Sequence, residues 1–255
     1  MIDVIYDSFN MQTNNVTVSD ISGVYGAPSR NVQVENIAGR DGGVLVDSKY
    51  NPRTITISGQ LTANTQLELE TLITQFNRAL NKEEKELKIE DEGDYIVYTA
   101  TPSVVQVERP RGLTKANFNV DFVCANPVGL VQGIIILAND TYTTASDSTA
   151  ITVEGSYKAE PVISVVVNSF TGTGDRSVII RNGKNFAGIT VTRTWTAGDE
   201  LEIDCKNLTV TVNGATTDFV GLFPSWQAGN GIISYVDTFT ARDVDITVTY
   251  NKRKV

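Results

Sequence analysis

The chain has no histidine, and only two cysteines and two tryptophans among 255 residues. Without histidine it cannot form a Ser-His-Asp or Cys-His catalytic group, a histidine-ligated zinc site or the usual proton shuttle of neutral pH. Cys124 and Cys205 lie far apart, each in a stretch that alternates apolar and polar residues. We interpret both as buried small apolar side chains, with a disulfide as the alternative.

Long apolar runs and clustered basic residues are also missing. The run "GIIIL" at 133–137 is far too short to cross a bilayer, and the N-terminal "MIDVIYDSFN" carries acidic residues where a secretion signal carries basic ones. The formal net charge is -9, from 21 Lys and Arg against 30 Asp and Glu. Proteins that bind nucleic acid need clustered Lys and Arg against the phosphates, so we expect neither specific nucleic-acid binding nor membrane insertion.

Most of what is present is typical of strands. Segments such as "RTITISGQL" (53–61), "PVISVVVNSF" (161–170) and "VDITVTY" (244–250) alternate apolar and polar residues or are rich in β-branched ones. The Asn-Gly pairs at 182–183 and 213–214 indicate hairpins, because both residues tolerate positive φ.

One segment has helical spacing instead. Residues 65–81, "TQLELETLITQFNRALN", place their apolar residues on a single stripe, which predicts one amphipathic helix against a sheet. Thr65 and Glu68 have the spacing of a capping box. The charged run "NKEEKELKIEDEGD" (81–94) is interpreted as a solvated helix end and loop.

A domain boundary is expected near "CANPVGLVQG", where Asn126-Pro127 ends a series of strands. We place the first domain at about 1–130 and the second at about 131–255. The predicted fold is mainly β: a first barrel-like or sandwich domain that carries the helix, and a second domain that is a β-sandwich.

No catalytic, cofactor-binding or metal-binding site is predicted. The acidic clusters "EDEGD" (90–94) and "GDELEID" (198–204) lack the spacing of an EF-hand and are interpreted as turn and strand acids. The segment "TGTGDRS" (171–177) lacks the third glycine of a dinucleotide loop and is interpreted as a hairpin loop. The stretch 39–53, "GRDGGVLVDSKYNPR", is interpreted as a long loop, either an interaction loop or an idle loop without a binding role.

Several motifs in order resemble the siphophage distal tail proteins. The first is "GRDGGVLVDSKYNPRTITISGQL" followed by the helix, the second is "YKAEPVISVVV", and the third is the closing region from "AGDELEIDC" through "GLFPSWQAGNGIISYVD" to "VDITVTYNKRKV". One departure is local. Trp226 stands where the family pattern has a leucine, and Asn230 comes one place early.

The resemblance implies a structural, non-enzymatic role in the virion tail tip, with assembly in the host cytoplasm. It implies a homo-hexameric ring built by a tail-tube-like N-terminal domain, and a galectin-like or carbohydrate-module-like C-terminal sandwich. Expected partners are the tail tube protein, the tail-associated hub or lysin protein, the tape-measure protein and receptor-binding proteins. No cofactor is expected. The candidate ring-contact residues are Arg40, Asp41, Gly42, Gly43, Lys49, Tyr50 and Arg53.

The alternative function is a carbohydrate-binding sandwich that recognises glycans of the host cell surface. The aromatic side chains that could stack on a sugar in the second domain are Trp195, Trp226, Tyr157 and Tyr235. Because the family pattern has an apolar leucine in the slot of Trp226, we favour burial of this tryptophan in a core over a role as a sugar platform.

Overall fold

The computed structural model describes residues 3–91 and 93–255, and the chain divides into two compact units. The first comprises the chain up to Gln132 together with Val255, and the second runs from Gly133 to Lys254. The mainly β fold predicted from the sequence is confirmed, and α1 (Gln66–Leu80) is the one helix among the described residues. Each unit has its own apolar core.

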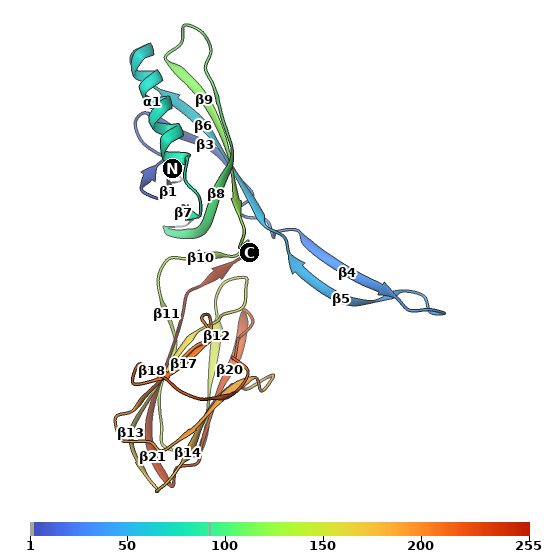
Figure 1. Ribbon diagram of the computed structural model, residues 1–255, viewed down its shortest axis with the longest axis vertical. Coiled ribbons are helices and arrows are strands. Elements are labelled where there is room, and N and C mark those ends of the chain that lie inside the picture. Colours follow the sequence, from blue (N-terminus) through green and yellow to red (C-terminus); the bar gives the residue numbers. More distant parts are fainter. Residues whose placement is uncertain (1–2, 92) are drawn as a thin grey trace. The chain divides into compact units, whose positions relative to one another are not determined.

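The first unit is built on an antiparallel sheet with the strand order β2-β1-β7-β8-β9-β6-β3 (Figure 1). The long strand β8 changes neighbour along its length: residues 94–100 pair with β7 and residues 101–108 with β9. The strand bounds are β1 Val4–Tyr6, β2 Phe9–Asn10, β3 Val16–Ser22, β6 Arg53–Thr62, β7 Lys85–Asp91, β8 Asp94–Glu108, β9 Lys115–Cys124 and β10 Gly129–Val131.

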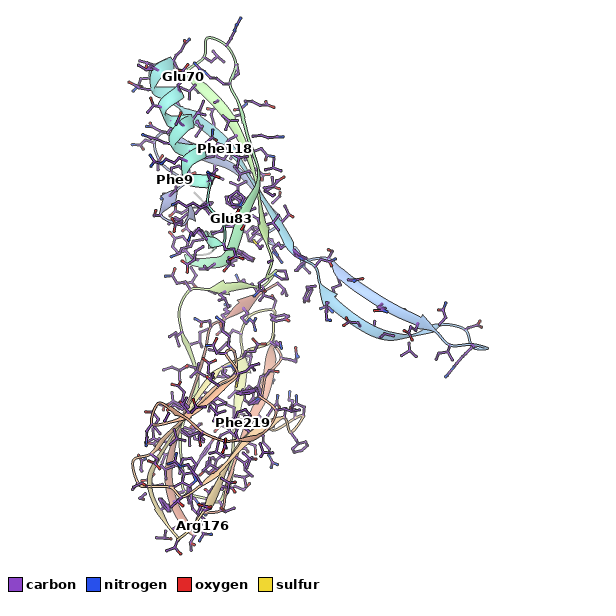
Figure 2. The ribbon with its side chains drawn as sticks, viewed as in Figure 1. Phe9, Glu70, Glu83, Phe118, Arg176 and Phe219 are labelled. Carbon is purple, nitrogen blue, oxygen red and sulfur yellow. The ribbon has the colours of Figure 1, made fainter. Side chains whose placement is uncertain are left out.

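Helix α1 covers one face of this sheet. Its buried side chains are Leu69, Phe76 and Leu80, and the ring centroids of Phe76 and Phe118 are 4.9 Å apart. Phe118 lies on β9 and is labelled in Figure 2. The predicted capping box is confirmed: the N–H of Glu68 donates to Oγ1 of Thr65, and the N–H of Thr65 donates to Oε2 of Glu68. The apolar stripe therefore orients the helix, and the cap sets where it begins.

Two segments that the sequence indicated as loops are strands. In the charged run 81–94, β7 pairs with both β1 and β8 and buries Leu87 and Ile89 between its solvated charges. In the stretch 39–53, residues from Gly43 to Tyr50 form β5, which pairs with β4 (Arg30–Asn36). Both predictions were wrong because neighbouring strands satisfy the backbone of these polar segments, which composition alone does not show.

The second unit is a sandwich of two antiparallel sheets, with orders β11-β21-β13-β16-β17-β18 and β12-β20-β14-β15-β19. The segment 171–177 links β13 to β14 in the opposite sheet, so it is not a hairpin loop. The bounds are β11 Ile135–Tyr142, β12 Ser146–Val153, β13 Val162–Thr171, β14 Arg176–Asn182, β15 Gly188–Arg193, β16 Glu200–Asp204, β17 Thr209–Val212, β18 Ala215–Thr216, β19 Val220–Gly221, β20 Gly229–Asp237, β21 Ala241–Tyr250 and β22 Arg253–Lys254.

Trp226 is part of the core of this sandwich. Its side chain is 1 % exposed and its indole N–H donates to the carbonyl of Ile232 at 2.9 Å. A Cβ on Gly231 would lie 2.8 Å from Cδ1 of Trp226, so the neighbouring strand comes this close only because residue 231 has no side chain. The predicted burial of Trp226 is confirmed.

Candidate assembly interface

The described residues contain no group of three or more His, Cys, Asp or Glu side chains that could hold a metal ion. In this part of the chain no helix is both long and apolar enough to span a membrane. Cys124 and Cys205 are buried free thiols, as predicted, and burial raises the pKa of each to about 12. Such thiols are poor nucleophiles and poor metal ligands at neutral pH.

The aromatic side chains considered for sugar stacking do not form an exposed platform. Trp195, Trp226 and Tyr235 are buried in the sandwich core, and the indole N–H of Trp195 donates to the carbonyl of Arg176. Tyr157 is half-buried under the guanidinium of Arg253, at 5.0 Å from the ring centroid. Nothing at these four positions favours carbohydrate recognition.

The hairpin of β4 and β5, which we call the arm, has an apolar face without a covering layer. Val34 pairs with Leu45 across the two strands, and these side chains are 55 % and 59 % exposed. Val32 is exposed on the same face, while Gln33 and Asp47 form a cross-strand pair on the other. A two-stranded hairpin alone is marginally stable in water, and exposed valine and leucine side chains gathered in this way mark an interaction surface.

The candidate ring-contact residues are distributed over three places. Arg40, Asp41 and Gly42 lie in the exposed turn at the arm tip, and Gly43 begins β5. Lys49 and Tyr50 lie at the arm base. There Lys49 pairs with Asp47 at 3.1 Å, and the guanidinium of Arg30 lies over the ring of Tyr50 at 4.2 Å.

Arg53, the seventh candidate, is 3 % exposed. Its Nη1 donates to the carbonyls of Gly23 and Val24 at 2.9 and 2.5 Å, and its Nη2 donates to the carbonyl of Gly26 at 2.9 Å. Residues 23–26 precede the arm and Arg53 follows it, so this guanidinium joins the two segments that carry the arm. Its place is in the support of the arm and not on its surface.

Two open strand edges were not found from the sequence. Among the described residues, β3 pairs only with β6, and residues 104–108 of β8 pair only with β9. The sheet β8-β9-β6-β3 thus presents an unpaired edge on each side. Val104 and Val105 on the β8 edge are partly exposed, and the β-branched run "PSVVQVE" was the only signal for them.

The face of this sheet away from α1 is polar. On β6 it carries Thr54, Thr56 and Ser58, and on β9 it carries Asn119 and Asp121. The hydroxyl of Thr56 donates to Asp121 at 2.7 Å. The alternate residues of the same strands, among them Ile55, Ile57, Val120 and Phe122, are buried in the core beneath α1.

Comparison with known proteins agrees with this architecture. Residues 7–124 match the model of the phage tail protein RIFT-related domain, and residues 154–253 match that of the siphovirus-type tail component, C-terminal domain. No curated protein sequence matches the chain.

Solved structures of phage tail components resemble the chain. The crystal structure of the phage SPP1 Dit protein, described there as a paradigm of the hub adsorption apparatus of phages that infect Gram-positive hosts, is 14 % identical. It aligns over 100 % of both chains with a TM-score of 0.69. A chain of the phage P2 baseplate in its activated conformation with Ca is 10 % identical over 98 % of both chains, with a TM-score of 0.46.

A phage tail domain followed by a tail component C-terminal domain defines a structural protein of a siphophage tail. The chain belongs to the siphophage distal tail protein family. It is a structural component of the tail tip, is located in the virion and is assembled with other tail components.

Proposed function

We propose that six copies of the chain form a ring at the tail tip, with the first unit building the ring. The observation that carries this proposal is the pair of open edges on the sheet β8-β9-β6-β3. Each neighbouring pair in the sheet is antiparallel, so β8 and β3 run in opposite directions. The β8 edge of one copy therefore fits the β3 edge of the next as an antiparallel neighbour, which is a heterologous contact of the kind that closes rings.

The arm supplies a second contact. Its apolar face of Val32, Val34 and Leu45 is expected to pack on the neighbouring copy, with Lys49 and Tyr50 at the base and the turn of Arg40 to Gly42 at the tip. Covering such a face removes apolar area from water, at roughly 25 cal/mol for each Å². Arg53 supports this contact from inside the unit.

The polar face of the sheet is proposed to line the channel. Thr54, Thr56, Ser58, Asn119 and Asp121 on that face offer hydroxyls, amides and a carboxylate, and the cation Lys115 lies on it only at the end of the sheet, opposite Thr62. The whole chain has a net charge of -9. A surface of this kind does not hold phosphates, so DNA passes without being retained.

In this proposal the role is structural and not enzymatic. The ring connects the tail tube protein to the tail-associated hub protein around the tape-measure protein, and the second unit is available to receptor-binding proteins. Assembly takes place in the host cytoplasm before release. The support is the family, the open edges and the amphipathic arm.

Light scattering and negative-stain imaging of the purified chain test the ring. We expect a mass six times the 27.7 kDa of one chain and ring-shaped particles. Val105→Pro at the β8 edge should abolish the rings, because proline removes a backbone donor from the ladder. Leu208→Lys, at an exposed site of the second unit, is the matched control. A monomer at all concentrations, alone and with purified tail tube protein, contradicts the proposal.

A further inference from the structure

A groove of about 470 Å³ runs beside the first half of α1, on the side of β3. It is lined by Asn15, Asn64, Leu67, Thr71, Leu72 and Gln75, among others. Leu67 is 74 % exposed, although it is a large aliphatic side chain in the first turn of the helix. The groove thus offers apolar surface between amide and hydroxyl groups.

The place of the groove in the sheet is given by the strand register. Asn15 comes directly before β3, whose first residue Val16 pairs with Leu61 of β6. Leu61 in turn pairs with Ala116 of β9. The groove therefore opens at the β3 edge, at the end of the sheet where β9 begins.

The loop between β8 and β9, residues 109–114, lies at the same end of the sheet but at the opposite edge. The guanidinium of Arg109 donates to Glu70 on α1 at 2.7 Å, and the carbonyl of Thr114 accepts from the N–H of Ala63 at 2.9 Å. Both ends of the loop are thus held. Between them Arg111 and Leu113 are exposed, and Leu113 is 52 % accessible.

We propose that this loop makes a contact of the ring by inserting into the groove beside α1 of the next copy. The inference rests on the edge pairing proposed above. When β8 of one copy runs antiparallel to β3 of the next, the Glu108 end of β8 meets the Val16 end of β3, and the loop comes to the groove. Leu113 then packs beside Leu67, and each covers an apolar side chain that its own unit leaves exposed.

Charge agrees with a second copy as the occupant. The loop and the start of β9 carry Arg111 and Lys115, while the acidic side chain at the groove is Glu68. Glu70 is already paired with Arg109 of its own chain. In the proposed contact a basic loop of one copy therefore meets an acidic side chain at the groove of the next. Because loop and groove lie at opposite edges of the sheet, this attraction favours a head-to-tail arrangement of the copies.

A mixed disulfide experiment tests the contact. One preparation carries Leu113→Cys and the other Gln75→Cys, with different affinity tags, and the mixture is oxidised with diamide. Because Cys124 and Cys205 are buried, only the introduced thiols react. We expect disulfide-linked dimers that carry both tags and are separated by dithiothreitol.

The matched control replaces Gln75→Cys by Asn77→Cys, on the flank of α1 that faces β8. Equal linkage in the control, or linkage only between chains with the same tag, overturns the proposal. Rings in negative stain without a link from residue 113 to residue 75 overturn this contact and leave the ring standing. The absence of both rings and links overturns the ring as well.

A second variant measures the contribution of Leu113. Leu113→Glu should raise the concentration of half-assembly by about tenfold, as expected for a buried apolar anchor, while the thermal midpoint of the unassembled chain stays unchanged. Unchanged assembly would show that the loop does not bind the groove of the next copy.

Discussion

At the scale of single residues, Arg53 joins the segments that carry the arm. We expect Arg53→Met to destabilise the first unit by about 1–3 kcal/mol, because it leaves the carbonyls of Gly23, Val24 and Gly26 without their donor. Urea unfolding measures the loss, and limited proteolysis should show faster cleavage within residues 23–29. Arg40→Ala at the exposed arm tip is the control and should change neither quantity.

Trp226 and Gly231 are complementary in volume. Trp226→Ala should cost about 3–5 kcal/mol of stability, because it empties a core position. Gly231→Ala should also destabilise, since a Cβ there meets Cδ1 of Trp226 at 2.8 Å. In a Trp226→Leu background the same change should cost less, and a double-mutant cycle from urea unfolding measures the difference. Additive costs would show that the two residues do not constrain each other.

The buried thiols limit stability at alkaline pH. In the unfolded chain a cysteine ionises near pH 9, whereas burial raises the pKa of Cys124 and Cys205 to about 12. Between these two pH values the thiols ionise in the unfolded chain and stay protonated in the folded one. The free energy of unfolding should therefore fall as the pH rises from 9 to 12. Urea unfolding at pH 8 and pH 10.5 checks this, and a thiol reagent at pH 8 should label only unfolded protein. Rapid labelling of the folded chain would contradict it.

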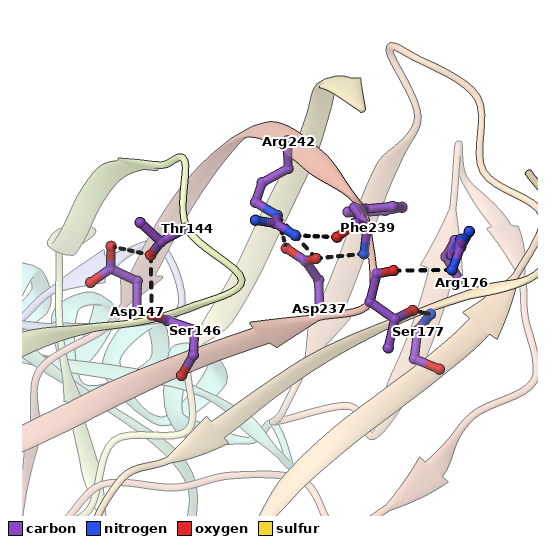
Figure 3. Close-up of polar contacts among 9 residues, drawn as sticks. Thr144, Ser146, Asp147, Arg176, Ser177, Asp237, Phe239 and Arg242 are labelled. Atoms are coloured by element: carbon purple, nitrogen blue, oxygen red, sulfur yellow. Dashed lines mark hydrogen bonds and ion pairs between the residues drawn. The ribbon is translucent and has the colours of Figure 1, made fainter. Parts of the chain in front are cut away.

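At the scale of elements, the turn from β20 to β21 is closed by a buried ion pair (Figure 3). Asp237 accepts from the backbone N–H of Phe239 at 2.7 Å and lies 3.0 Å from Nε of Arg242. The Arg242 guanidinium also donates to the carbonyl of Phe239. The side chain of Asp237 is fully buried, so water cannot replace it as the partner of the Arg242 guanidinium and of the backbone N–H in the turn.

Removing Asp237 should therefore leave a buried, uncompensated guanidinium. We expect Asp237→Ala to lower the free energy of unfolding by about 3–5 kcal/mol. Asp218→Ala, at an exposed position of the same unit, should change it by less than about 0.5 kcal/mol. Thermal or urea unfolding of both variants gives the comparison, and equal effects would contradict a special role for the turn.

The sequence pattern of the arm does not show that its apolar side chains are exposed. The apolar-polar alternation in "NVQVEN" (31–36) is that of an ordinary half-buried strand, yet both faces of the hairpin are exposed. An alternating pattern reports which residues share a face, and not whether another layer covers that face. The apolar face of the arm is therefore visible only in the tertiary structure.

At the scale of the whole molecule, the arm should matter to assembly and not to folding. It pairs only with itself among the described strands, and its apolar side chains are outside both cores. Replacing residues 31–49 by a short Gly-Ser linker should leave the thermal midpoint nearly unchanged and reduce ring formation in light scattering. A large drop in the midpoint would show that the arm is part of the folding unit.

The sequence by itself determined the mainly β class, helix α1 with its Thr65–Glu68 cap, and the burial of both cysteines. Each of these follows from local periodicity, from hydrogen bonds between near neighbours in the chain, or from the apolar nature of one side chain. The resemblance of the ordered motifs led to the family and, through the leucine of the family pattern, to the burial of Trp226.

Only the tertiary structure decided the strand edges, the groove beside α1 and the buried place of Arg53. A strand edge exists because of strand order, which depends on residues tens of positions apart, such as Ile57 and Val120. Arg53 is buried because carbonyls of a segment about thirty residues earlier turn toward it. Contacts of that range leave no local pattern, and for that reason the support of the arm looked like part of its surface.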